Sequence, residues 1–115
     1  YTGTPRNAIQ WAIDNCTAGR AVELLSGTFN LDAYINVYRS LIGQSDMSTI
    51  LKATANFPAT PSMLYVKTNT GYGVTSITIQ DLELDGNRAN NTAKKFGGLE
   101  PMGCTYIKIK NLRKF

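Results

Sequence analysis

Short runs of alternating apolar and polar residues fill most of the chain after Gly19, and they limit the folds open to it. Each run is only three to five residues long and is bounded by Gly, Asn, Asp or Pro, which is typical of short β-strands separated by turns. The expected strands are 21–25, 28–31, 35–37, 40–42, 49–52, 63–67, 76–80, 82–84 and 106–110. Many short strands after a single helix favour a β-sandwich, a barrel or a solenoid.

One helix is expected before these strands, over residues 4–18. Thr4 can cap free backbone N–H groups, and Pro5 suits the first helical position. Apolar residues then recur at three- and four-residue spacing and form one stripe along the helix. The stripe consists of Ala8, Ile9, Ala12, Ile13 and Cys16. Gln10 and Asp14 lie off this stripe, so we expect them on the opposite face of the helix.

An internal repeat favours a solenoid among the three architectures. The segment 77–82 (ITIQDL) matches 107–112 (IKIKNL) at an offset of 30, and 35–43 aligns on the same pattern at an offset of 42. In each copy two β-branched residues alternate inward, a polar bend follows, and an apolar residue returns inward. Such a corner lets a coiled chain keep one continuous core. A sandwich would show the alternation without the repeated corner.

Several segments resemble a known family. The opening NAIQWAID (7–14) with AVELLSGTF (21–29), then 41–51, ITIQDLELDGN (77–87) and GCTYIKI (103–109) resemble right-handed parallel β-helix proteins of the pectate lyase-like and polygalacturonase-like superfamily. The likeness covers nearly the whole chain. It implies an all-β, right-handed parallel β-helix, with residues 1–115 as one domain, 4–18 as the capping helix and 20–115 as the first rungs. Relatives continue for several hundred residues, so we expect a truncated N-terminal portion.

The same resemblance suggests a function. The superfamily contains polysaccharide lyases, glycoside hydrolases, uronate epimerases and phage tailspikes, which implies carbohydrate binding along an outer face. We therefore expect the N-terminal part of an extracellular or cell-surface lyase or hydrolase that acts on acidic, uronate-containing polysaccharide. The alternative is a non-catalytic binding or structural protein, tailspike- or adhesin-like, or one that assembles end to end. No catalytic motif of the family matches here, so the catalytic residues stay unassigned and this fragment alone is expected to be inactive.

Composition excludes several kinds of chemistry. The chain has no histidine, so it contains no Ser-His or Cys-His nucleophile pair, no histidine-bound zinc and no imidazole acid or base. Two cysteines, Cys16 and Cys104, are too few for a Cys-rich metal site, and we expect two buried thiols without a disulfide. We expect no cofactor and no metal. No apolar stretch approaches the roughly 20 residues that a membrane-spanning helix needs.

Charge is distributed unevenly. Residues 1–87 carry five Lys/Arg and seven Asp/Glu, a net of −2, whereas 88–115 carry seven Lys/Arg and one Glu, a net of +6. A basic end favours an acidic polymer as partner, although a solvated surface is the plainer interpretation. Nucleic acid is not expected, because the basic residues lack interleaved aromatics. Lys94 and Lys95 lie in a polar insertion, 86–95, which we expect to form a loop.

Six residues are candidates for substrate binding. Asn36, Tyr38, Tyr65 and Lys67 occupy outward positions on expected strands, where aromatic faces beside amide and ammonium groups suit sugar rings. Scattered tyrosines on a sheet also occur without a ligand. Lys108 and Lys110 belong to the basic end and could attract an acidic partner or repel another strand. The last strand would present an unpaired edge, through which the chain could self-associate.

A row of carboxylates offers a different site. Asp81, Glu83 and Asp85 alternate along one strand and could hold calcium or act as acid and base if the strand were straight. The bend after Gln80 is expected to turn Asp81 away. The 30-residue offset also aligns Glu83 with Arg113, and an ion pair between stacked strands is the interpretation that we favour.

Overall fold

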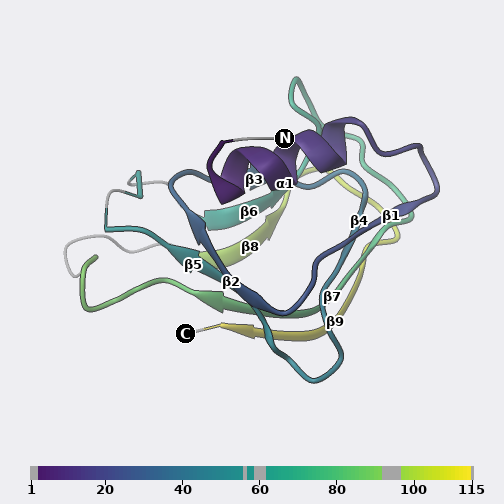
Figure 1. Cartoon of the computed structure of the whole chain (residues 1–115). Helices are drawn as coiled ribbons and strands as arrows, with labels where there is room; N and C mark the ends of the chain where they lie inside the picture. Colours follow the sequence, from purple (N-terminus) through teal and green to yellow (C-terminus); the bar gives the residue numbers. More distant parts are fainter. Residues whose placement is uncertain (1–2, 56, 59–61, 92–96, 115) are drawn as a thin grey trace.

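The computed structural model describes residues 3–55, 57–58, 62–91 and 97–114. One helix precedes nine short strands in these ranges (Figure 1). They are α1 (Pro5–Asp14), β1 (Ala21–Glu23), β2 (Gly27–Leu31), β3 (Ile35–Asn36), β4 (Ser40–Ile42), β5 (Thr49–Ala53), β6 (Ser62–Val66), β7 (Thr78–Asp85), β8 (Gly97–Pro101) and β9 (Lys108–Lys114).

The strands form two sheets in which the paired strands are parallel. The larger, six-stranded sheet has the order β1-β4-β7-β5-β2, with β9 paired to β7. It curls into a half-barrel, and β7 and β9 run side by side along its outer side (Figure 1). The smaller sheet has the order β3-β6-β8. Helix α1 packs against β2 and β3.

The expectation of an all-β, right-handed parallel β-helix is wrong, because the chain forms a mixed structure of one helix, a curled sheet and a second small sheet. The larger sheet branches at β7, whose residue Ile79 pairs with Leu41 of β4 while Leu84 pairs with Leu51 of β5. The alignment at an offset of 42 also fails, because Ile35 pairs with Leu64 in the smaller sheet. Alternation in a sequence shows which face of a strand is buried, and it does not specify the partner strand.

The alignment at an offset of 30 is confirmed by the pairing of β7 with β9. Ile79 lies opposite Ile109, and Leu82 lies opposite Leu112. The expected corner is present too, because Asp81 (φ 61°) and Asn111 (φ 48°) both adopt the left-handed conformation. Since Asp and Asn tolerate this conformation better than most residues, the polar position of the repeat is the one that can turn the chain.

The helix begins where the sequence predicts. Thr4 has an extended backbone and its hydroxyl accepts a hydrogen bond from the N–H of Asn7, at 3.2 Å. The helix ends at Asp14, four residues before the expected end, because Asn15 leaves the helical conformation and its side chain donates to the carbonyl of Trp11. No helix in the described part of the chain is long and apolar enough to cross a membrane.

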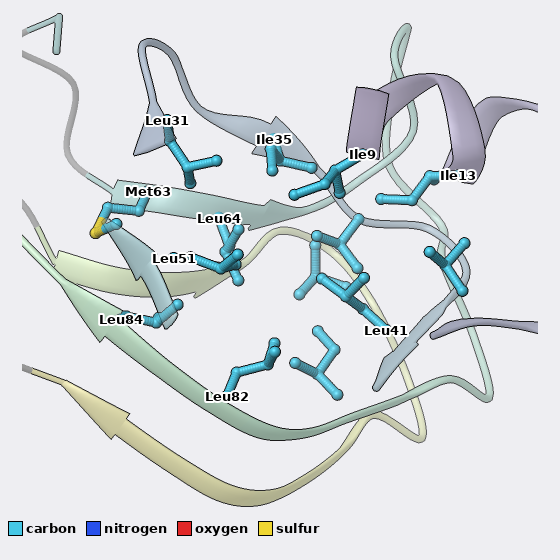
Figure 2. Packing of buried hydrophobic residues seen from close by; sticks show 14 of the residues in the cluster. Ile9, Ile13, Leu31, Ile35, Leu41, Leu51, Met63, Leu64, Leu82 and Leu84 are labelled. Carbon is cyan, nitrogen blue, oxygen red and sulfur yellow. The ribbon is translucent and has the colours of Figure 1, made fainter. Parts of the chain in front are cut away.

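The core fills the space between α1 and the two sheets (Figure 2). Ile9 and Ile13 of α1 point into it, together with leucines of β4, β5, β6 and β7. Cys16 and Cys104 are half-buried free thiols packed against this core. The absence of a disulfide between them is as predicted, but neither thiol is fully buried.

The sequence interpretation missed β8, and it divided β7 into two strands. β8 carries two glycines and a proline in five residues, so its composition indicates a turn more than a strand. A Cβ at Gly98 would lie 2.8 Å from Cδ1 of Leu84, so glycine permits this close approach. Lys94 and Lys95, predicted to lie in a loop, fall outside the described residues.

Candidate functional site

A pocket lies on the face of the smaller sheet that points away from the core. The register aligns Asn36 of β3 with Tyr65 of β6, and Tyr65 with Glu100 of β8. Side chains two residues apart on a strand share a face. Tyr34, Lys67 and Met102 each lie two positions from one of these three residues, so they belong to the same surface. The pocket has a volume of about 280 Å³ and is lined by Tyr34, Tyr65, Lys67, Glu100 and Met102.

Two tyrosine rings form the aromatic part of the pocket. The rings of Tyr34 and Tyr65 meet edge to face, with centroids 5.1 Å apart and planes at 86°. This is a favourable arrangement for an aromatic pair, because the positive edge of one ring faces the negative face of the other. Tyr65 is only 8% exposed, so its ring is held by packing before any ligand arrives.

Lys67 and Glu100 supply opposite charges to the pocket, and both are half-buried. Within the ranges that the structure describes, neither side chain takes part in an ion pair or a hydrogen bond. The ammonium group of Lys67 can donate up to three hydrogen bonds, whereas the carboxylate of Glu100 can only accept. The pocket therefore combines aromatic surface, one cation and one acceptor, all available to a ligand.

The structure separates the six residues predicted to bind substrate. Tyr65 and Lys67 meet in the pocket, as described. Asn36 is adjacent to Tyr65 in register but is 7% exposed, and its side-chain amide donates to Oδ1 of Asn69 at 3.0 Å. Lys108 and Lys110 lie on β9, in the other sheet, and are exposed. The six residues therefore do not form one surface.

Tyr38 belongs to a hydrogen-bond network at the end of α1. Oδ1 of Asp14 accepts hydrogen bonds from the hydroxyl of Tyr38 and from the amides of Asn69 and Gln10. Partial burial raises the pKa of the Asp14 carboxyl, but these three hydrogen bonds outweigh it and leave that pKa below its usual value. Partial burial and the bond to Asp14 raise the pKa of Tyr38 to about 12. The network ties the helix to two loops.

The carboxylate row of β7 does not converge on a common point. Glu83 forms an ion pair with Arg113, with Oε1 and Nε 3.3 Å apart, as the repeat predicts. Asp81 accepts hydrogen bonds from the side chains of Gln80 and Asn111. Asp85 accepts from the backbone N–H of Asn87. Among the described residues, no three Asp, Glu or Cys side chains gather as a metal site would require.

Three pocket residues escaped the sequence interpretation. Tyr34 lies two positions before Asn36, and its place on the same face could have been found by extending the alternation of β3 backward. Glu100 and Met102 could not be found, because they depend on β8, which was not predicted. Comparisons of the chain with protein-family models, with curated proteins and with solved structures found no match.

Proposed function

We propose that this chain binds acidic carbohydrate, with one uronate residue held in the pocket formed by Tyr34, Tyr65, Lys67, Glu100 and Met102. The observation that carries the proposal is the placement of two packed tyrosine rings beside a lysine whose charge has no partner among the described residues. The same chemistry is expected from the resemblance to carbohydrate-active proteins, and it fits an extracellular or cell-surface location.

Each pocket group has a role that matches uronate chemistry. The apolar face of a sugar ring packs against an aromatic ring, and Met102 adds a soft apolar contact. The ammonium group of Lys67 binds the sugar carboxylate through a charge-assisted hydrogen bond. Glu100 accepts hydrogen bonds from sugar hydroxyls. A pocket of about 280 Å³ is slightly smaller than the roughly 300–1,000 Å³ of sites for drug-sized ligands, a size that suits one sugar residue.

The pocket supports binding better than catalysis. Glycoside hydrolases use a pair of carboxylates on either side of the scissile bond, whereas Glu100 is the one carboxylate among the lining residues. Accordingly, we assign no lyase or hydrolase step to these residues. The lyase or hydrolase activity on acidic polysaccharide that the resemblance implies stays a prediction, and its catalytic residues would lie outside the pocket.

Isothermal titration calorimetry with oligogalacturonates that contain no unsaturated sugar tests the proposal. Neutral oligosaccharides of equal length are the comparison ligands. We expect the acidic ligand to bind and the neutral one to bind much more weakly. Lys67→Ala is expected to weaken binding about tenfold or more, because a charge-assisted hydrogen bond contributes about 1.5–3 kcal/mol. Tyr34→Ala is expected to weaken binding of both ligand types by removing ring contact.

Lys52→Ala is the matched control, because Lys52 is a half-buried lysine of β5 in the other sheet. It should leave the affinity unchanged. Equal loss in Lys52→Ala and Lys67→Ala would mean that the ligand responds only to net charge and would refute the pocket. Retention of full affinity in folded Lys67→Ala would refute it as well.

Self-association through β9 was the other expected interaction. Two copies that met edge to edge through β9 would bring their basic rows together, and like charges on paired strands are destabilising. The exposed lysines on this strand, Lys108 and Lys110, therefore argue for a partner of opposite charge.

A further inference from the structure

We propose that the pocket selects a uronate that also carries a free amino group, so that Lys67 binds its carboxylate and Glu100 binds its ammonium. This inference rests on the proposed function and deepens it, because it names the chemical class of the uronate. The lining residues include one cation and one anion. A plain uronate matches only the cation, whereas a uronate with an ammonium group matches both.

The two charges lie at different levels of the smaller sheet. Glu100 of β8 is aligned with Tyr65 of β6, and Lys67 lies two residues after Tyr65. The N–H of Met102 donates to the carbonyl of Val66 at 3.2 Å, so the two segments stay side by side up to the level of Lys67. Two residues of a strand span roughly 7 Å. Glu100 therefore lies beside the aromatic pair, and Lys67 lies one pleat further along the sheet.

The opposite charges of the pocket are not used up by each other. In the part of the chain that the structure describes, Lys67 and Glu100 form no ion pair. Both side chains are half-buried, so a ligand that fills the pocket removes water from both of them. A charge that loses its water without gaining a partner is costly. A plain uronate would leave Glu100 in this state and would place a second negative charge near it.

A six-membered sugar ring can carry the two matching charges on opposite sides. In a 2-amino-2-deoxyuronate the carboxylate is attached to C5 and the amino group to C2, across the ring from each other. The ring packs against the tyrosines and Met102, as in the proposed binding of a uronate. Its ammonium group then lies beside Glu100 and the tyrosine rings, whose faces also attract cations. A zwitterionic sugar thus satisfies every group of the pocket.

Isothermal titration calorimetry on the whole 115-residue chain tests this selection with three methyl glycosides. They are the glucuronate, its 2-amino-2-deoxy analogue and the N-acetyl form of that analogue, all at about pH 6, where the amine is protonated. We expect the amino form to bind about tenfold or more tightly than the other two, because it adds a charge-assisted hydrogen bond. The N-acetyl form keeps an N–H donor without the charge, so it separates the effect of charge from that of hydrogen bonding.

Glu100→Gln tests which residue binds the ammonium. This substitution removes the negative charge and keeps the shape of the side chain. The variant is expected to lose the preference for the amino form and to bind the plain glucuronate more tightly than the wild-type chain does, because the repulsion is removed. Glu23→Gln makes the same change in charge at an exposed residue of β1, in the other sheet, and is the matched control. It should keep the preference, and circular dichroism checks that both variants are folded.

A linear zwitterion tests whether the pocket selects a sugar. 6-Aminohexanoate carries the same two charges without a ring, so we expect it to bind more weakly than the amino sugar, since it offers no ring face to the tyrosines. Equal affinity of the two ligands would overturn the choice of a sugar. A preference for the amino form that persists in Glu100→Gln would likewise overturn the role given to Glu100.

The titration with oligogalacturonates separates this inference from the proposed function. If the oligogalacturonate binds and the amino form gains nothing over the plain glucuronate, the inference is overturned and the proposed function stands. If neither the oligogalacturonate nor any of the three glycosides binds the folded chain, both are refuted. Binding of the amino form alone would support the inference and restrict the proposed function to zwitterionic sugars.

Discussion

Gln10 offers a direct test of how α1 is joined to the smaller sheet. Its side chain is 7% exposed and forms two hydrogen bonds with the backbone of Asn36, accepting from the N–H at 2.9 Å and donating to the C=O at 3.0 Å. On the other side of β3, the N–H of Val37 bonds to the carbonyl of Tyr65. Gln10 therefore takes the place of a neighbouring strand on the free edge of β3.

Gln10→Met removes both hydrogen bonds and keeps most of the side-chain volume. It leaves the N–H and C=O of Asn36 buried without partners, and each unsatisfied group costs about 1–3 kcal/mol. The expected loss in the free energy of unfolding is therefore about 2–6 kcal/mol for the two groups together. Because whole domains are stable by only about 5–15 kcal/mol, the change is large and should lower Tm by roughly 10–20 °C.

Urea denaturation followed by circular dichroism measures this loss. Gln10→Glu is a second variant, which can still accept from the N–H of Asn36 but cannot donate to its C=O, so we expect it to be destabilised as well. Asn7→Ala is the control, because Asn7 is an exposed residue of the same helix and its loss should cost less than about 0.5 kcal/mol. A loss below about 1 kcal/mol in Gln10→Met would refute the reasoning.

Two further predictions concern other parts of the fold. A Cβ at Gly43 would lie 2.2 Å from the backbone carbonyl oxygen of Asp81, so Gly43→Ala should lower the free energy of unfolding by about 3 kcal/mol, measured by urea denaturation. Gly71→Ala, which meets nothing within 4 Å, is its control, and equal stability of the two variants would contradict the clash. The second prediction concerns Tyr38, whose pKa is about 12. An ultraviolet titration should show one tyrosine ionising near pH 12, and this step should be absent in Tyr38→Phe. The pKa of Tyr38 is higher in the folded state than its ordinary value of 10.0. The contribution of this tyrosine to stability should therefore be complete below pH 10 and be lost as the pH rises to 12. Asp14→Asn should lower the pKa of Tyr38 only partly, because the burial of the Tyr38 side chain remains. A wild-type titration curve that matches that of Tyr38→Phe would contradict this assignment.

The pocket depends on three strands that are distant in the sequence. Tyr34, Tyr65 and Glu100 come from segments about 30 residues apart and meet only because β3, β6 and β8 pair in register. Any change that shifts this register by one residue would turn the lining side chains toward the core. Stability of the smaller sheet, including the contact of Gln10 with β3, is therefore a condition for the proposed binding.

The sequence by itself determined the features that arise from neighbouring residues or from repetition. Thr4 and Pro5 set the start of α1 through local capping. The repeat of residues 77–82 at 107–112 set the register of β7 with β9, the left-handed corner and the Glu83–Arg113 ion pair. Each of these depends on spacing along the chain, which can be read without knowing the partner strand.

Tertiary structure alone decided how the strands are arranged and which side chains meet. The branching of the larger sheet at β7, and the pairing of Ile35 with Leu64, depend on contacts between distant segments. Gln10, which lies off the apolar stripe, is buried because the edge of β3 needs a hydrogen-bond partner. Glu100 joins the pocket through β8, a strand with weak local propensity that is held by its pairing with β6. Local pattern specifies which face is buried, whereas long-range hydrogen bonding and packing choose the partner.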